Sequence, residues 1–428
     1  MNLGLQILRH NNVVISRLSL PFFLIASFFE AQAVLQAQAV HTYVGGIEPH
    51  QALIAWGTTS GQNTIGKSSA PMGKATLTVG DQQIPATENW AIAKGLDADH
   101  EYHYEIAIDS KKIGEGKFRT WPEHATSLCF FVLGDYGTGT DAQMQVAAAM
   151  DREYKKHAAT GCPIRFVITT GDNIYADLNV GFRAIHSGDS DTDWEDKFFK
   201  PYENLVREIP FFPSPGNHDG SDTENRGDLS AYLDNFFYPG NRPARWYTFQ
   251  FADLAQFFSI DSTANAEAGR SKPVYLESGE QFSWLTKTMK QANVPWRIPY
   301  YHHPIFNAGP FHGASYKDLK HFLPLFQQSG VKVVFNGHEH NFQYSERSDN
   351  TFGIRFVISG AGGELRHGDV RGKMIKNRIE GWAPELHFLS VDIEGKEMRI
   401  TPLGVKAPLV PTTNEGGEGK MPLLVTVP

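Results

Sequence analysis

The hydrophobic pattern divides the chain into two parts. Between residues 40 and 121, short segments alternate apolar and polar residues, and turn residues separate them without any helical stretch. This pattern predicts a small all-β sandwich. The expected strands are 41–45, 52–56, 75–79, 90–93, 101–108 and 115–119. The polar, proline-containing stretch 120–125 is the expected linker to the next domain.

From residue 127 onward, apolar runs alternate with stretches of helical period, which predicts an α/β domain. The expected strands are 128–133, 164–168, two within 246–260, a short one before Tyr301, 331–335, 355–359, a hairpin of 386–393 with 398–402, and an edge strand at 423–427. The expected helical segments are 143–157, 193–206 and 279–291. We therefore place this domain at residues 127–404, followed by a tail at 405–428.

One corner of the β-sandwich carries a distinctive tyrosine. Tyr102 follows Leu96 near the start of an expected strand. This resembles the fibronectin type III pattern, in which such a tyrosine ties down the preceding corner. Core packing is the alternative, and we prefer it for Trp56, Tyr102 and Tyr104.

The composition narrows the class of protein. The 428 residues are 41% hydrophobic and 20% charged, as in an ordinary soluble globular protein. A net charge of −8 provides no overall basic surface for nucleic acid or an anionic membrane. The 17 histidines make metal binding a hypothesis to test.

The N-terminal residues 1–39 have the organisation of an export signal. Basic residues precede the apolar run 18–29, and small-residue sites ending at Ala33 and Ala39 follow it. The run is short for a transmembrane helix and is broken by Pro21. An uncleaved membrane anchor is the alternative. We expect cleavage after Ala33 or Ala39 and an exported, soluble protein.

The chain contains two cysteines, Cys129 and Cys162. Both lie at or just before the start of apolar runs that we expect to be strands of one sheet. A disulfide is therefore geometrically feasible, and two buried thiols are the alternative.

Potential metal ligands cluster where the expected strands end. In open α/β sheets, ligands bind at the carboxyl ends of the strands. Carboxylate, amide, phenol and imidazole groups together suit two hard-to-borderline metal ions. One such segment alone would be a common turn or a core histidine, but five in one domain predict a metal site. The five segments are Gly134-Asp-Tyr-Gly, Gly171-Asp-Asn-Ile-Tyr, Gly216-Asn-His-Asp, Tyr301-His-His-Pro and Gly337-His-Glu-His.

The second of these segments is central to the hypothesis. The strand at 164–168 delivers Asp172 and Tyr175 to its C-terminal end. An aspartate can bridge two cations through its two oxygens, and a tyrosine can bind a hard trivalent ion as phenolate. Since the ordinary pKa of tyrosine is about 10, phenolate ligation needs a strong Lewis acid nearby.

The five segments resemble the five-block pattern of the purple acid phosphatases, within the calcineurin-like metallophosphoesterases. That pattern is GDxG, GDxxY, GNH(D/E), VxxH and GHxH, and four blocks match here as written. In the fourth, Pro299 replaces valine, and proline cannot donate to a β-ladder. General members of the superfamily carry Asp-x-His in the first block. This chain has Asp135-Tyr-Gly there and supplies Tyr175 instead, which is the mark of the ferric branch.

The resemblance implies an αββα metallophosphoesterase sandwich at residues 127–404, preceded by a fibronectin-like sandwich. It also implies two metal ions that share one bridging carboxylate. The implied ferric ligands are Asp135, Asp172, Tyr175 and His340, and a divalent ion (Fe, Zn or Mn) would be held by Asp172, Asn217, His302 and His338.

Three further histidines receive roles from the resemblance. His218, next to a ligand, would face the phosphate and stabilise the transition state or protonate the leaving alkoxide. His312 has the spacing of a further catalytic histidine of the family. His303 is expected to point away from the metals.

The implied activity is that of an exported acid phosphatase, which hydrolyses small phosphate monoesters with a metal-activated hydroxide. One alternative is a phosphodiesterase or nucleotide pyrophosphatase with the same site. Another is a binding protein with a vestigial phosphatase fold, which the complete ligand set argues against. We expect neither nucleic acid nor, after signal removal, a membrane as a partner. The natural substrate and the oligomeric state stay open.

Overall fold

The computed structural model describes residues 40–57, 73–180, 183–185, 191–223, 227–267, 270–271 and 273–428. The expected export signal at 1–39 lies outside these residues. Within them, no helix is both long enough and apolar enough to cross a membrane.

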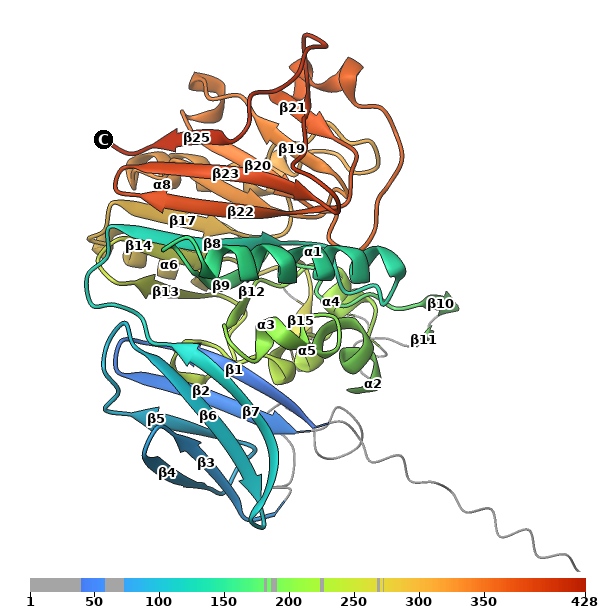
Figure 1. Ribbon diagram of the computed structural model, residues 1–428. Helices are drawn as coiled ribbons and strands as arrows, with labels where there is room; N and C mark the ends of the chain where they lie inside the picture. Colours follow the sequence, from blue (N-terminus) through green and yellow to red (C-terminus); the bar gives the residue numbers. More distant parts are fainter. Residues whose placement is uncertain are drawn as a thin grey trace, which may run out of the picture. The chain divides into compact units, whose positions relative to one another are not determined.

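Two mixed β-sheets pack face to face in the α/β part (Figure 1). The first sheet contains, in spatial order, β12 (Phe211–Pro213), β9 (Ile164–Thr169), β8 (Ser127–Leu133), β22 (His387–Glu394), β23 (Glu397–Gly404) and β25 (Leu423–Thr426). The second contains β13 (Tyr247–Phe251), β14 (Ala255–Ser259), β17 (Trp296–Tyr300), β18 (Val333–Asn336), β20 (Arg355–Ser359), β19 (Phe342–Ser345), β21 (Ile379–Ala383) and β24 (Thr412–Thr413). Strands β12, β9 and β8 are parallel, as are β14, β17, β18 and β20, so their carboxyl ends share an edge within each sheet.

Aromatic side chains fill the space between these two sheets. Phe130 and Phe166, from the first sheet, contact Phe257 of the second with ring centroids 5.1 Å apart in both pairs. All three are fully buried. Edge-to-face contacts of this kind add to the burial of apolar area, so this layer fixes how the two sheets face each other.

Helices cover the outer faces of both sheets. Helix α1 (Asp141–Ala158) packs against β9 and β22 through a buried face that includes Val146 and Met150. On the second sheet, α6 (Glu280–Gln291) and α8 (Phe322–Gln328) share an apolar cluster with residues of β14, β18 and β20. The predicted αββα architecture is therefore confirmed.

Shorter elements connect these layers. The remaining helices are α2 (Asp191–Trp194), a π-helical turn (Glu195–Phe199), α3 (Glu203–Val206), α4 (His218–Ser221), α5 (Ser230–Asn235), α7 (Tyr316–Leu319) and 3-10 turns at Pro239–Asn241, Asp349–Thr351, Arg371–Lys373 and Ile375–Asn377. Two small hairpins pair β10 (Leu178–Val180) with β11 (Arg183–Ile185) and β15 (Ala266–Glu267) with β16 (Arg270–Ser271).

The described residues between 41 and 119 form strands and turns without a helix, as predicted. One sheet contains β1 (His41–Ile47), β2 (Gln51–Gly57) and β5 (Trp90–Lys94), and the other contains β4 (Gln82–Ala86), β3 (Ala75–Val79), β6 (Glu101–Ile108) and β7 (Lys111–Arg119). Strand β4, which is rich in glutamine and contains a proline, was not expected. The arrangement is consistent with a β-sandwich, and its fibronectin-like identity stays a prediction.

The tyrosine corner forms as its sequence suggests. The Tyr102 hydroxyl accepts a hydrogen bond of 2.9 Å from the backbone N–H of Asp97. Trp56 and Tyr104 are buried in the core, as the core-packing interpretation predicts. Tyr102 both packs against Phe118 and ties down the corner, so the two interpretations of this residue are compatible.

One apolar core joins the β-sandwich to the α/β part. Tyr43 of β1 is fully buried, and its ring centroid lies 6.2, 6.1 and 5.6 Å from those of Phe198, Phe199 and Phe237. Residues 38–428 form one compact unit, so the boundaries at 40–121 and 127–404 stay predictions.

Proline accounts for two local differences from the expected elements. The helical segment expected at 193–206 is broken into α2, the π-helical turn and α3, with Pro201 at the break. Pro299 lies inside β17, and this strand pairs with β18 through one residue pair, Tyr300 with Phe335. The ladder is shortened where proline lacks an N–H, yet β17 still leads directly to His302.

A disulfide links the starts of two neighbouring strands. Cys129 of β8 and Cys162, just before β9, are bonded with a Cα–Cα distance of 5.8 Å. The structure therefore contains the disulfide rather than two buried thiols.

We expect Tyr43→Ala to lower the free energy of unfolding by about 3–5 kcal/mol, because it removes a fully buried aromatic ring. Denaturant unfolding measures this change. Leu276→Ala is the control, since Leu276 is 42% exposed and its loss should change stability by about 0.5 kcal/mol or less. A loss below about 1 kcal/mol for Tyr43→Ala would contradict a core shared by the two parts.

Candidate metal centre

The structure brings the seven predicted metal ligands together at the ends of five strands. The first sheet contributes the ligands that follow β8, β9 and β12, and the second contributes those that follow β17 and β18. In chain order they are Asp135, Asp172, Tyr175, Asn217, His302, His338 and His340. Their role as ligands stays a prediction.

The first group of donors surrounds the hydroxyl of Tyr175. This oxygen lies 3.3 Å from Asp135 Oδ1, 3.0 Å from Asp172 Oδ2 and 3.1 Å from His340 Nε2. All four side chains are buried. These are the four residues expected to hold the ferric ion.

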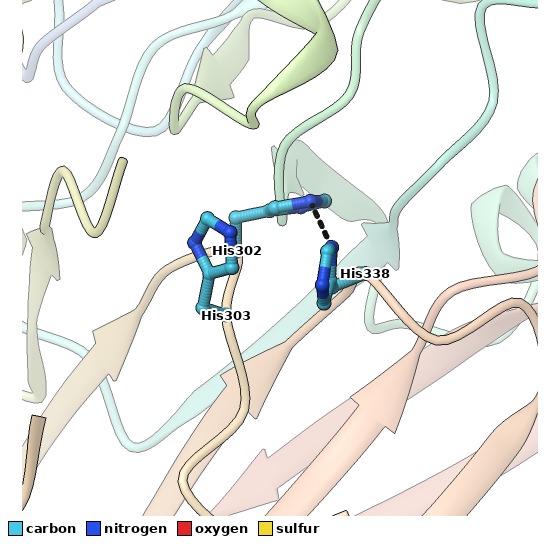
Figure 2. A group of neighbouring side chains, drawn as sticks. All are labelled: His302, His303 and His338. Carbon is cyan, nitrogen blue, oxygen red and sulfur yellow. Dashed lines mark hydrogen bonds between the residues drawn. The ribbon is translucent and has the colours of Figure 1, made fainter. Parts of the chain in front are cut away.

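The second group surrounds Nε2 of His302. This nitrogen lies 3.0 Å from Asn217 Oδ1, 3.1 Å from His338 Nδ1 and 3.3 Å from Asp172 Oδ2. Figure 2 shows His302 and His338 facing each other across this contact. His302 Nδ1–H donates to the carbonyl of Thr170 at 2.9 Å, which leaves Nε2 as the ring atom that faces the other donors.

Both groups include the same oxygen, Oδ2 of Asp172. The other oxygen, Oδ1, accepts a 2.8 Å hydrogen bond from the backbone N–H of His218. That Asp172 bridges two cations stays a prediction. Its Oδ2 lies between the two donor groups, whereas its Oδ1 accepts from the backbone.

The donor spacings fit metal ions. Two ligand atoms that lie about 2.1 Å from one ion, at angles between 90° and 110°, are about 3.0–3.4 Å apart. Measured from Tyr175 Oη and from His302 Nε2, the distances are 3.0–3.3 Å, and His340 Nε2 lies 3.5 Å from Asp135 Oδ1. Each group therefore has the dimensions of one coordination sphere.

Three of the seven residues adopt the left-handed backbone conformation, which is uncommon outside glycine. The φ angles are 55° at Asp135, 49° at Asp172 and 72° at His338. Such conformations cost about 1–3 kcal/mol each and persist where the surrounding structure imposes them. Here hydrogen bonds fix the turns: His338 N–H donates to both carboxylate oxygens of Asp135, at 3.0 and 2.9 Å.

Glycine is required at two positions of the motifs, because atoms of neighbouring loops lie too close for a side chain. A Cβ at Gly216 would lie 2.1 Å from the backbone N of Asp172, and a Cβ at Gly337 would lie 2.4 Å from Asp135 Oδ2. No side chain fits at these distances. The glycines of the third and fifth segments therefore allow neighbouring loops to touch the two carboxylates.

The electrostatics of the buried groups favour a bound cation. Burial raises the pKa of Asp135 to about 7, although the nearby His302 and His340 oppose this. Burial and the charges of Asp135 and Asp172 raise the pKa of Tyr175 far above its ordinary value. A highly charged cation would reverse both effects, since it stabilises carboxylate and phenolate.

His218 is oriented by a carboxylate that the sequence analysis missed. His218 Nδ1 lies 2.9 Å from Asp222 Oδ2, and this oxygen also accepts from the N–H of Ala176 at 2.8 Å. Burial lowers the pKa of His218, but the charge of Asp172 and the hydrogen bond to Asp222 raise it more, to about 9. In the metal-free protein the imidazole is therefore protonated at neutral pH, and its Nε2–H is left to act as a donor.

The other two histidines lie on the second sheet's side of the site. The rings of His312 and His338 are stacked, with centroids 3.9 Å apart, and His312 is partly exposed. His303 Nδ1 lies 3.0 Å from Ser262 Oγ, and its ring is 4.5 Å from that of His338. Figure 2 shows His303 beside His302 on the same segment. Burial lowers the pKa of His303 to about 3, so this histidine is neutral.

Two further carboxylates hold the loops of the site and were not singled out from the sequence. Asp219 accepts from the N–H of Asn173 at 2.9 Å and from that of Gly216 at 2.7 Å, so it joins the second and third segments. Glu339, between two predicted ligands, is buried. Asp219 and Glu339 both stand inside quoted segments, and the i, i+4 spacing of His218 and Asp222 was the sequence signal for the carboxylate that orients His218.

The predicted ligands lie in a segment that is similar to known phosphoesterases. Residues 130–342 match the family model described as calcineurin-like phosphoesterase. The chain is 28% identical to purple acid phosphatase 3 of Arabidopsis thaliana over 291 residues, which cover 64% of this chain and 74% of the relative. It is 25% identical to tartrate-resistant acid phosphatase type 5 of Sus scrofa over 307 residues, which cover 64% of this chain and 82% of the relative.

A solved structure shows the same fold. The purple acid phosphatase from yellow lupin seeds superposes with a TM-score of 0.64 at 14% identity, over 90% of this chain and 74% of that one. At this identity the likeness concerns the fold alone.

We expect Asp222→Asn to lower the pKa of His218, because it removes a charged acceptor. In the metal-free protein, the pKa of His218 is raised on folding, so protonated His218 stabilises the fold. This stabilisation is complete below about pH 6.5 and is lost as the pH rises through about 9. The variant should therefore lose about 1.5–3 kcal/mol at pH 6 and less at pH 9. NMR titration of His218 and unfolding at both pH values measure these changes.

Asp196→Asn is the matched control, because Asp196 pairs with Lys200 at the surface and should contribute about 0.5 kcal/mol or less. An unchanged His218 pKa in Asp222→Asn would show that Asp222 does not set the protonation of this imidazole.

Proposed function

We propose that this protein is an exported acid phosphatase that hydrolyses phosphate monoesters at a binuclear Fe(III)–M(II) centre. The match of residues 130–342 to the calcineurin-like phosphoesterase model supports the reaction class. The observation that carries this proposal is Asp172 Oδ2, which belongs to both donor groups. Two relatives named as acid phosphatases support the reaction class. The Cys129–Cys162 disulfide supports export, since disulfides persist mainly in oxidising compartments.

The two donor groups suit different ions. Tyr175 and two carboxylates give the first group hard, anionic oxygens, which favour Fe(III). His302, His338 and the Asn217 amide oxygen suit a divalent ion such as Fe(II), Zn(II) or Mn(II). When bound, such a pair supplies Lewis acidity that activates water and neutralises charge on the phosphoryl group.

The surrounding residues supply the proton and the orientation. Asp222 holds the His218 ring through Nδ1, so Nε2–H can donate to a phosphoryl oxygen or to the leaving oxygen as the P–O bond breaks. The backbone N–H of His218 fixes Asp172 through Oδ1. His312, stacked on His338, is the second candidate catalytic histidine, although its Nε2 is 3.1 Å from Arg366 Nη1.

The domain organisation is part of the proposal. No predicted ligand lies in residues 40–121, so the β-sandwich would support the phosphatase domain at 127–404 mechanically rather than chemically. The aromatic contacts of Tyr43 are the physical basis of that support.

Nitrophenyl phosphate and bis(nitrophenyl) phosphate test the reaction class. We expect the purified enzyme to hydrolyse the monoester with the higher kcat/KM, because two ions and a protonated His218 suit a dianionic phosphate. His218→Ala should retain both metals and lose roughly 10²- to 10⁴-fold in kcat, as for a lost general acid. A preference for the diester would favour a phosphodiesterase, and a metal-free His218→Ala would make His218 a ligand.

Tyr175→Phe tests the ferric site. A tyrosine phenolate bound to Fe(III) gives a broad visible band through ligand-to-metal charge transfer, so we expect a pink to violet wild-type protein. The variant removes one oxygen and should lose the band while it keeps some iron through Asp135, Asp172 and His340. Visible absorption and iron content measure both. A colourless wild-type protein with a full complement of oxidised iron would refute the phenolate assignment.

A further inference from the structure

The open face of the candidate centre is defined by side-chain exposure. Asp172 and His302 are buried, whereas the side chains of His218 and His312 are 27% and 33% exposed. His338 is also partly exposed. A substrate must therefore reach the two donor groups from the side of these three histidines, and its leaving group must project outward past them.

Phe311 lies next to this opening with most of its ring in solvent. Its relative exposure is 61%, and it is the one phenylalanine among the large hydrophobic side chains that are exposed in the described part of the chain. A single exposed apolar side chain is common at protein surfaces. Phe311 differs because a backbone hydrogen bond and a contact with Arg366 place it beside the candidate centre.

Glu339 holds the backbone of Phe311 in place. This fully buried carboxylate accepts hydrogen bonds from the N–H groups of Phe311 and His312, at 3.3 and 2.8 Å. It also accepts a 3.1 Å hydrogen bond from the side chain of Asn307. Since Glu339 stands between His338 and His340, the loop that carries Phe311 is fastened to the same turn as two predicted ligands.

Arg366 connects the exposed ring to the centre. Its guanidinium carbon lies 5.5 Å from the centroid of Phe311, and its Nη1 lies 3.1 Å from His312 Nε2. His312 in turn stacks on His338. A continuous series of contacts thus leads from a predicted metal ligand, through an imidazole and a cation, to an exposed aromatic ring.

We propose that Phe311 and Arg366 form a subsite for the leaving group of aromatic phosphate monoesters. With the phosphate at the two donor groups, an aryl ring directed outward meets the exposed ring of Phe311 and stacks on it. Arg366 adds positive charge beside an anionic substrate and covers part of the Phe311 ring by a cation–π contact. This subsite rests on the proposed function and names a preferred substrate class for it.

Binding of phosphonates to the metal-loaded enzyme tests the subsite without turnover. Phenylphosphonate and methylphosphonate share the phosphonate group and differ in the ring, so calorimetry gives the preference for the ring as a ratio of dissociation constants. We expect the wild type to bind phenylphosphonate about 2- to 10-fold more tightly. Phe311→Ala should abolish this ratio, and Phe311→Tyr, which keeps a ring, should retain it.

Ile375→Ala is the control, because Ile375 is 68% exposed and no part of this series of contacts. Equal affinity for the two phosphonates in the wild type, or an unchanged ratio in Phe311→Ala, would overturn the subsite. Hydrolysis of phenyl phosphate, measured in parallel, separates the two proposals. If the protein hydrolyses phenyl phosphate but binds the two phosphonates equally well, the subsite alone is disproved. If it prefers phenylphosphonate but does not hydrolyse phenyl phosphate, the phosphatase activity alone is disproved.

Discussion

The central constraint in this protein is the burial of two carboxylates, Asp135 and Asp172, beside a phenol and two imidazoles. Taking an ionised carboxylate out of water is costly unless a partner charge compensates. The raised pKa values of Asp135 and Tyr175 express that cost in the absence of cations. At Asp172 burial also raises the pKa, but the charges of His302 and His218 lower it further, to well below its ordinary value. Two metal ions would supply the missing charge, and the distances among the donors match the dimensions of two coordination spheres that share one oxygen.

The scaffold imposes this arrangement against the local preference of the backbone. Asp135, Asp172 and His338 hold left-handed conformations, and neighbouring loops approach so closely that only glycine fits at Gly216 and Gly337. Parallel strands bring these turns to one edge of each sheet, and the aromatic layer between the sheets brings the two edges together. The rigidity of the core is therefore what keeps a strained site in place.

The sequence predicted the architecture and the candidate ligands because both depend on short-range patterns. Apolar runs that end in Gly-Asp or Gly-x-His indicate strand ends with donors. The sequence could not predict contacts between segments distant in the chain, such as the single shared oxygen of Asp172 or the hydrogen bonds of Glu339 to the loop of Phe311. It also left open whether the two cysteines are bonded, and it missed the helix break at Pro201.

Metal analysis of the purified protein tests the central claim most directly. Our account predicts about two metal equivalents per chain, at least one of them iron, and the loss of both in Asp172→Ala, because two like-charged ions cannot stay close without the carboxylate between them. Fewer than about one equivalent in the wild type, or two equivalents retained by Asp172→Ala, would contradict the account.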